Sequence, residues 1–230
     1  CMKYLEALNF KGLDKKDYKY NTTCLGGFTN GTTVVEMAAG YATIANDGEY
    51  RTPDCIIKIT DAKGNDIVPE DTSTKSVYSS SASRMMTSVL QSCVTEYEGT
   101  AHVCQLDVDM PAACKTGTTN NYVDGWLCGY TPYYTTAVWV GMDVYKSVDN
   151  LKGNTYPASI WTNYMNKIHQ RLPRKEFESY LGDTESTTEA TTESTEDDTE
   201  STTEATTEAI EDDETKYTTT EADDSGSDYN

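Results

Sequence analysis

The seven cysteines of this 230-residue chain include no Cys-x-x-Cys pair, so neither a zinc site nor a thioredoxin-like redox centre is indicated. An odd number of cysteines also cannot pair completely within one chain. Because they are scattered among apolar residues, we expect them to be small buried side chains. The sequence therefore predicts no metal and no cofactor.

The sequence also lacks any run of about 18 apolar residues and does not open on a signal peptide. No segment of it is therefore predicted to cross a membrane. The first residue is Cys1 rather than Met, and we expect the chain to be an excised part of a longer protein.

Positive charge is nearly missing from the C-terminal stretch. Residues 183–230 carry 18 acidic side chains against the single Lys216, which accounts for 17 of the 20 net negative charges. Within this stretch, residues 185–193 recur unchanged as 200–208. Such Thr/Glu/Ser repeats bury too little apolar surface to offset the entropy of ordering, so 183–230 is predicted to be a disordered acidic tail. The length of 230 residues and the 37% hydrophobic content predict one folded domain, over residues 1–182. Because these residues are nearly neutral, they are not expected to form a nucleic-acid surface.

Within the predicted domain, apolar residues at helical spacing alternate with short extended segments. A capping box, with Thr33 as N-cap and Glu36 three residues later, opens a helix that ends at Asn46. Other helices are predicted over residues 2–10, from the serine cluster at 79–83 to Tyr97, and over 157–172. Strands are predicted over residues 55–60, 66–68, 112–119, 122–130 and 135–142. Their short connections make them antiparallel, so we expect an α+β fold with helices packed on an antiparallel sheet.

Two further patterns have structural interpretations. Gly26-Gly27 is followed by no Gly-Lys-[Ser/Thr], so it is predicted to be a turn rather than a phosphate loop. The third helix carries apolar residues that we predict to face the core. They are Met85, Met86, Val89, Leu90, Cys93, Val94 and Tyr97.

The best site candidate is the run Cys114-Lys115-Thr116-Gly117-Thr118-Thr119, which joins two apolar stretches. A lysine beside a residue without a side chain can face a reacting group while a ligand lies against the backbone. We predict a catalytic role for Lys115 and substrate binding by residues 116–119. Alternation along the strand predicts that Cys114 points away from the side that Lys115 faces.

Several blocks in one order resemble the last third of the transpeptidase domain of class A penicillin-binding proteins. They are Lys115-Thr116-Gly117-Thr118-Thr119, then residues 124–132 (DGWLCGYTP), then 137–141 (AVWVG). Upstream, residues 26–31 (GGFTNG) and 36–43 (EMAAGYAT) are similar to the segment between the second and third motifs of that family. The resemblance covers roughly residues 1–172 and implies the fold shared by serine β-lactamases and penicillin-binding transpeptidases.

The resemblance implies peptidoglycan cross-linking by acyl transfer. A serine attacks a D-Ala-D-Ala stem peptide, and an amine resolves the acyl-enzyme. Lys115 would help proton transfer around the nucleophile. The hydroxyls of Thr116 and Thr118 would hold the substrate carboxylate, the Thr118 N–H would form half of an oxyanion hole, and Gly117 would let peptide or β-lactam lie along the strand. The implied partners are stem peptides and β-lactams, at the extracytoplasmic face of the membrane through an anchor missing from this sequence.

The sequence departs from the family pattern in two motifs. No Ser has a Lys three residues later, and no Ser-x-Asn occurs; Tyr164-Met165-Asn166 has a similar form but lies in the last predicted helix. We therefore expect an incomplete transpeptidase fragment that is inactive and marginally stable alone. A serine β-lactamase or D,D-carboxypeptidase of the same fold, or a non-catalytic wall-binding module, are alternatives. The blocks around Trp126 and Trp139 favour the synthetic enzyme.

Overall fold

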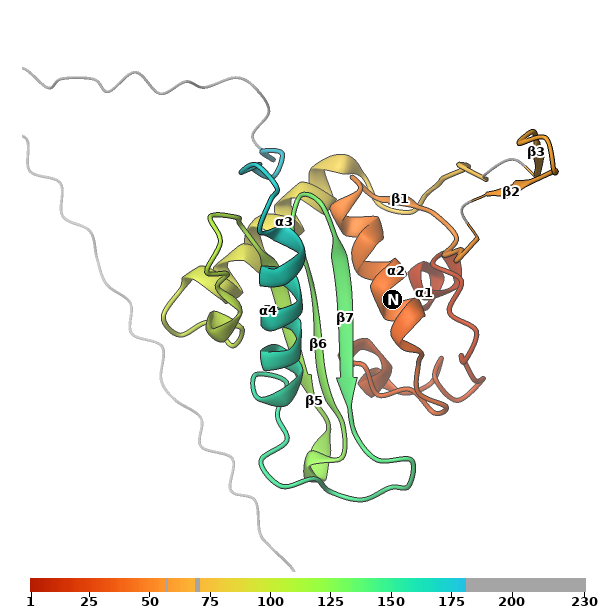
Figure 1. Ribbon diagram of the computed structural model, residues 1–230. Helices are drawn as coiled ribbons and strands as arrows, with labels where there is room; N and C mark the ends of the chain where they lie inside the picture. Colours follow the sequence, from red (N-terminus) through yellow and green to blue (C-terminus); the bar gives the residue numbers. More distant parts are fainter. Residues whose placement is uncertain (57, 69–70, 181–230) are drawn as a thin grey trace, which may run out of the picture. The chain divides into compact units, whose positions relative to one another are not determined.

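The computed structural model describes residues 1–56, 58–68 and 71–180. The predicted tail over 183–230 and its boundary with the domain lie outside these residues. The centre of the described part is an antiparallel sheet in the order β5-β6-β7 (Figure 1). Its strands are β5 (Ala113–Thr118), β6 (Gly125–Tyr130) and β7 (Thr135–Val140). They match the predicted strands, except that residues 120–122 form a short 3-10 turn, η3 (Asn120–Tyr122), before β6 begins.

Helices cover both faces of this sheet, which confirms the predicted α+β class. Side chains of β6 point alternately to the two faces of the sheet. Leu127 packs with Trp161 of the last helix on one face, whereas Tyr130 packs with Tyr41 of an earlier helix on the other. A third helix packs against β5. The helices are α2 (Val34–Ala45), α3 (Ser80–Thr95) and α4 (Tyr156–His169).

The face of the sheet beneath α4 holds the main apolar core. Leu127, Trp161 and Met165 have no exposed surface, and the Trp161 Nε1–H donates to the carbonyl oxygen of Thr136 at 3.2 Å. A Cβ at Gly129 would lie 3.0 Å from the Trp161 ring and 2.5 Å from the sulfur of Cys114. The helix can therefore lie close to the sheet because β6 has no side chain at that position.

The N-terminal region is tied down by polar groups. The capping box of α2 is confirmed: the Glu36 N–H donates to Thr33 Oγ1 at 3.2 Å, and the Thr33 N–H donates to the Glu36 carboxylate at 2.8 Å. The carboxylate of Asp17 is buried and accepts from the backbone N–H groups of Asp14 and Thr29, both at 2.8 Å. These bonds fix the turns before α2. The region also contains α1 (Met2–Ala7), shorter than the predicted helix, and η1 (Asn21–Leu25).

Four very short strands lie between α2 and α3. β2 and β3 form the predicted hairpin, but of the residues that the structure describes in the predicted strand 55–60, only the last two form a strand. The side chains of both strands are solvent-exposed, so the hairpin buries little apolar surface that would favour a longer strand. β1 and β4 form a second pair that the sequence did not indicate. The bounds are β1 (Glu49–Tyr50), β2 (Ile59–Thr60), β3 (Asp66–Val68) and β4 (Lys75–Ser76).

The prediction that the methionines of α3 face the core is wrong. Met85 is 55% exposed and Met86 46% exposed, and Val89 and Tyr97 are exposed as well. The prediction holds for Leu90 and Val94, and the other two buried residues of the helix are Ser83 and Thr87. Thr87 can take a core position because its Oγ1 donates to the Ser83 carbonyl oxygen and lies 2.8 Å from the hydroxyl oxygen of Tyr130. The buried Ser83 hydroxyl has no hydrogen-bond partner among the described residues.

The prediction that the cysteines are buried holds for only part of the set. Cys104, Cys114 and Cys128 are buried, Cys93 is half-buried, and Cys1, Cys24 and Cys55 are exposed. The exposed cysteines lie at the start of the chain, in η1 and in the segment before β2, where little apolar surface is available to cover them. All seven are free thiols.

Candidate functional site

The site candidate lies on β5, the edge strand of the central sheet. Lys115 pairs with Cys128 and Gly117 with Trp126, so Lys115 and Gly117 occupy the same face of the sheet. Lys115 is exposed, and its Nζ donates to the carbonyl oxygen of Thr116 at 3.0 Å. Gly117 is half-buried, and a Cβ there would lie 3.2 Å from the Cβ of Trp126, so the missing side chain lets the two strands pair closely at this point.

The outer edge of β5 carries backbone groups that the sheet does not use. The Thr119 N–H donates to the Asp124 carbonyl oxygen at 3.0 Å, which fixes the alternation of the ladder between β5 and β6. Residues 113, 115, 117 and 119 therefore bond to β6, while 114, 116 and 118 direct their N–H and C=O groups outward. The Thr118 N–H consequently points toward the open edge, beside the bare backbone of Gly117.

The structure separates the two threonine side chains from Lys115. Alternation places Thr116 and Thr118 on the α4 side of the strand. The Thr116 hydroxyl donates to Thr100 Oγ1 at 3.1 Å, and the Thr118 oxygen accepts the N–H of Gly153 at 3.0 Å. Residues 115–118 thus share one strand, but the ammonium group and the two hydroxyls lie on opposite faces of it.

Thr119 and Asp124 close the turn after β5. The Asp124 N–H donates to Thr119 Oγ1 at 2.8 Å, and the Thr119 hydroxyl donates to the Asp124 carboxylate at 3.1 Å. The other carboxylate oxygen of Asp124 accepts the Nε1–H of Trp139 at 2.9 Å. Asp124 thereby links the turn to β7, a role that sequence reasoning did not assign. Between them, Asn121 and Tyr122 have φ of 60° and 54°, a conformation that is uncommon for an aromatic residue.

Cys114 lies beside Lys115 in sequence but not in space. Its side chain is fully buried on the α4 face, against Gly129 and in the same cluster as Trp161, as alternation predicted. Burial, together with the neighbouring Cys104 thiol, raises the pKa of Cys114 well above the usual thiol value. A neutral buried thiol is a poor nucleophile, so Cys114 acts as a packing residue.

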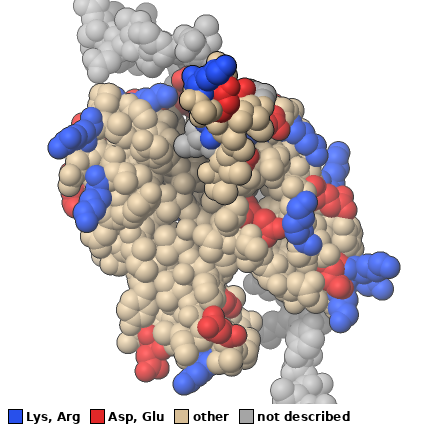
Figure 2. Space-filling model, turned by 45° about the vertical axis from the view of Figure 1, so that its right-hand side comes forward, with Lys and Arg blue, Asp and Glu red and all other residues tan. Residues whose placement is uncertain are grey.

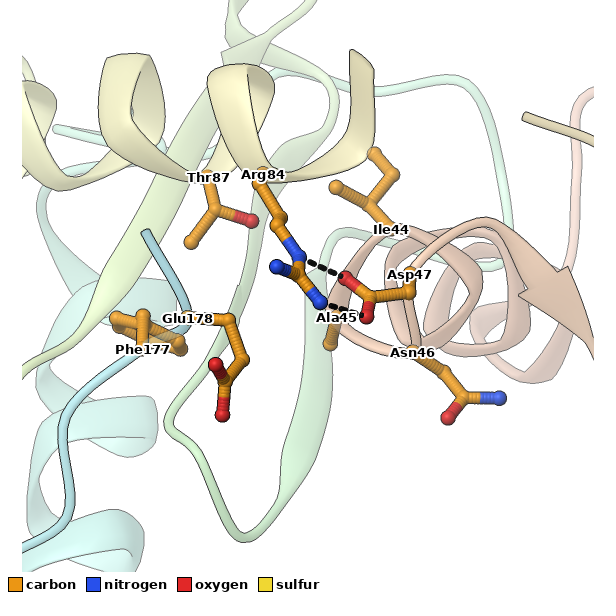
Figure 3. Close-up of a pocket in the computed structure, with 8 residues that line it drawn as sticks. All are labelled: Ile44, Ala45, Asn46, Asp47, Arg84, Thr87, Phe177 and Glu178. Carbon is orange, nitrogen blue, oxygen red and sulfur yellow. Dashed lines mark hydrogen bonds and ion pairs between the residues drawn. The ribbon is translucent and has the colours of Figure 1, made fainter. Parts of the chain in front are cut away.

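A small cavity lies between the end of α2, α3 and residues 177–178. Figure 3 shows Arg84 directed at the carboxylate of Asp47, with Phe177 and Glu178 on the facing wall. The cavity measures about 110 Å³, and the Arg84 Nε and Nη2 groups donate to Asp47 at 2.9 and 2.7 Å. The paired charges hold the end of α2 against α3, and none of the predicted site residues lines this cavity.

Charged groups elsewhere on the surface are mixed. Figure 2 shows lysine and arginine side chains interspersed with aspartate and glutamate around the margin of the visible face, whose centre is largely uncharged. Among the described residues, no three His, Cys, Asp or Glu side chains gather in an arrangement suited to a metal ion. No helix within the described ranges has both the length and the apolar character needed to span a bilayer.

Gly153 is the second contact that sequence reasoning missed. It lies in the loop between β7 and α4, more than 30 residues after Thr118, to which its N–H donates. A glycine within Lys-Gly-Asn has the local appearance of an ordinary turn. Only the fold brings it to the site strand, so no local signal marked it.

Known proteins are similar to this chain in sequence. A family model described as "Penicillin binding protein transpeptidase domain" matches residues 9–166. Penicillin-binding protein 4 of Bacillus subtilis is 35% identical over 158 residues, which are 69% of this chain and 25% of that protein. Penicillin-binding protein 1A of Clostridium botulinum is 34% identical over 154 residues, covering 67% of this chain and 18% of that protein. The chain thus spans a quarter or less of the length of these relatives.

Solved structures share the fold at lower identity. The penicillin-binding protein PonA1 from Mycobacterium tuberculosis aligns with a TM-score of 0.65 and 24% identity over 77% of this chain and 51% of that one. A second structure of PonA1, in complex with penicillin V, aligns equally well. Penicillin-binding protein 1A from Haemophilus influenzae aligns with a TM-score of 0.59 and 22% identity over 76% of this chain and 31% of that one. Given the family match over residues 9–166 and relatives above 30% identity, the chain belongs to the penicillin-binding protein transpeptidase domain family.

Proposed function

We propose that this chain forms part of the acyl-transfer site of a serine-type peptidoglycan D,D-transpeptidase. The observation that carries the proposal is the open edge of β5, where the Lys115 ammonium group adjoins the bare backbone of Gly117 and the outward N–H of Thr118. The 230 residues contain no Ser-x-x-Lys, so the proposal assigns the nucleophilic serine to polypeptide outside this sequence. The 230 residues alone are expected to be inactive.

In the proposed chemistry, the edge of β5, the Thr118 N–H and the Lys115 ammonium group each have a separate role. A peptide or β-lactam would add to the edge of β5 as an extended strand, because no described strand pairs with the outward backbone groups of residues 116 and 118. The Thr118 N–H would donate to the carbonyl oxygen as it gains negative charge. Lys115 would assist proton transfer from the serine hydroxyl. The roles of Thr116 and Thr119 in holding substrate remain predictions.

The proposed ligands are stem peptides ending in D-Ala-D-Ala and β-lactams that mimic them. The family name and the PonA1 complex with penicillin V support the β-lactam part of this assignment. Because the cross-linked substrate lies in the cell wall, the proposed location is the extracytoplasmic face of the membrane. The site as proposed needs no metal or cofactor, since the charges that it uses come from side chains and backbone.

The test is acylation of the full-length gene product by a fluorescent penicillin. Lys115→Ala should slow labelling by about a hundredfold or more, because general acid–base groups contribute on that order. Lys63→Ala is the matched control, since Lys63 is an exposed lysine in the β2–β3 turn. Equal labelling of the Lys115→Ala and Lys63→Ala proteins would count against the role of Lys115. Absence of labelling in the unaltered protein would count against the function itself.

A further inference from the structure

The loop between β7 and α4 is anchored on both sides of Gly153. Leu151 is fully buried, and a Cβ at Gly125 would lie 2.6 Å from its side chain, so the loop packs directly on the start of β6. The Val148 N–H donates to the Tyr122 carbonyl oxygen at 3.0 Å. Thr155 Oγ1 accepts the N–H of Lys152 at 2.9 Å. The position of residue 153 is therefore fixed by burial before it and by a closed turn after it.

Gly153 lies directly on the backbone of the site strand. A Cβ at this position would lie 2.7 Å from the Gly117 carbonyl oxygen, 2.8 Å from the Gly117 nitrogen and 2.5 Å from the Trp126 carbonyl oxygen. All three neighbours are backbone atoms of paired strands, so none can move aside as a side chain would. Any residue larger than glycine must displace either the loop or the end of β5.

The same glycine determines which hydrogen bonds the Thr118 hydroxyl can make. Its oxygen accepts the Gly153 N–H at 3.0 Å, which occupies one lone pair. Among the described residues, the structure gives the Thr118 hydroxyl proton no acceptor. The Thr116 hydroxyl differs, because its proton is donated to Thr100 Oγ1 at 3.1 Å. Thr118 is thus the hydroxyl of this strand whose proton is available to an anionic ligand.

We propose that Gly153 is a positioning residue for the ligand carboxylate, acting through Thr118. Its N–H orients the Thr118 oxygen, so that the hydroxyl donates to the carboxylate of a peptide or β-lactam, and its missing side chain lets the loop support Gly117. This inference rests on the proposed function, because it assumes that an acyl ligand with a carboxylate binds along β5. It adds a residue that lies outside the Lys-Thr-Gly strand.

The experiment compares a penicillin with its neutral methyl ester on the full-length gene product. Acylation rates are measured over a range of concentrations, which separates the binding constant from the rate of acylation. In Gly153→Ala the loop should be displaced rather than β5, because β5 is paired with β6 along its whole length. Binding of the acid should then weaken about tenfold, as expected for a lost hydrogen bond to a charged group, while the ester reacts within about twofold of the unaltered protein. Thr118→Val should behave likewise, and Thr118→Ser should retain most of the binding.

The double variant Thr118→Val/Gly153→Ala separates positioning from a general loss of structure. If Gly153 acts through Thr118, the double variant should bind the acid no more weakly than Thr118→Val alone. Equal slowing of acid and ester by Gly153→Ala, or penalties that multiply in the double variant, would overturn the proposal and leave the transpeptidase assignment intact. An unaltered protein that no penicillin acylates would instead remove the proposed function and this inference together.

A second measurement needs no substitution of Gly153. In Thr118→Val, the Gly153 amide loses its acceptor, so its hydrogen exchange should become at least severalfold faster, whereas amides in the centre of β6 should keep their protection. Unchanged exchange at Gly153 would show that its N–H does not depend on Thr118, which would also overturn the proposal. This measurement remains decisive if Gly153→Ala fails to fold.

Discussion

The two halves of the described chain are stabilised in different ways. Residues 80–169 surround the central sheet and bury large apolar side chains completely, among them Leu127, Trp161 and Met165. The N-terminal half has a smaller apolar cluster of Leu8, Ala39 and Tyr50, and the buried carboxylate of Asp17 holds its turns. The site strand β5 belongs to residues 80–169, where close packing holds it from the α4 side.

This contrast explains how an edge strand can be both rigid and accessible. On its α4 side, β5 is fixed by fully buried residues such as Cys114 and by the loop at Gly153. On the other side, Lys115 is exposed. The Lys115 ammonium group and the packing of Cys114 against α4 therefore lie on opposite faces of one strand, while the Thr118 hydroxyl lies on the packed face, where Gly153 contacts it.

The largest expected effect is a loss of stability in residues 80–169, called here the apolar half because they contain the completely buried apolar side chains. Trp161→Ala removes a fully buried indole and its hydrogen bond to the Thr136 carbonyl oxygen, and should lower the free energy of unfolding by about 3–5 kcal/mol. Urea unfolding followed by far-UV circular dichroism measures this change. Its matched control is Ile160→Ala, because Ile160 is the preceding residue of α4 and is 52% exposed. The control should change the free energy by less than about 0.5 kcal/mol; similar losses in both variants would contradict the contrast.

The apolar half was also the part that the sequence predicted best. The strands near 113–118, 125–130 and 135–140 follow from alternation and short turns, and α4 follows from its helical spacing. Burial within helices was predicted less well. The predicted core face of α3 included Met85 and Met86, whereas the buried face contains Thr87, because the Tyr130 hydroxyl supplies a partner for the Thr87 hydroxyl. A hydrogen bond between residues 43 positions apart leaves no local pattern.

In the N-terminal half, the buried carboxylate of Asp17 is expected to make stability depend on pH. Hydrogen bonds from the side chain of Thr29 and from the backbone lower the pKa of Asp17. A carboxylate with a lowered folded-state pKa stabilises the protein above its unfolded pKa of about 3.9, and this contribution is lost as the pH falls through the folded value. Asp17→Asn should therefore reduce stability at neutral pH and make the loss of stability below pH 4 less steep.

Thermal unfolding between pH 2.5 and pH 7 measures this dependence. Asp66→Asn serves as the control, because Asp66 lies in the exposed β2–β3 hairpin and pairs with Lys58 at the surface. The control should follow the unaltered protein closely at every pH. If Asp17→Asn also followed it closely, the buried carboxylate would not hold the N-terminal turns together.

A smaller effect is expected at the start of α2. Thr33→Ala removes the acceptor for the Glu36 N–H and should lower the free energy of unfolding by about 1 kcal/mol, since a helix N-cap contributes on that order. Thr33→Ser keeps the hydroxyl and should retain most of that stability. Urea unfolding of the two variants distinguishes the cap from simple side-chain volume. Equal losses in both would indicate that the methyl group, rather than the cap, matters.

The candidate site shows where sequence reasoning stops. The strand with Lys115 and the orientation of Cys114 follow from alternation and a recognisable motif. The same alternation also separates Thr116 and Thr118 from Lys115, and the structure shows what each hydroxyl bonds instead. Gly153 and Asp124 could not be found in this way, because their contacts depend on how a later loop and strand return to β5. Contacts between segments that are distant in the sequence produce no local pattern of composition or residue spacing from which they could be predicted.

The smallest effect is expected in the β2–β3 hairpin, which shares its local signals with β5 and β6 but contributes nothing to the buried core. Ile67 is 60% exposed, so Ile67→Ala should change the free energy of unfolding by less than about 0.5 kcal/mol. Leu127→Ala is the counterpart in β6, fully buried, and should cost about 2–5 kcal/mol. Urea unfolding of both variants compares two antiparallel hairpins in one chain. A large loss at Ile67 would mean that this hairpin packs against a surface that the described residues do not supply, and the contrast between the two halves would then be smaller than their burial indicates.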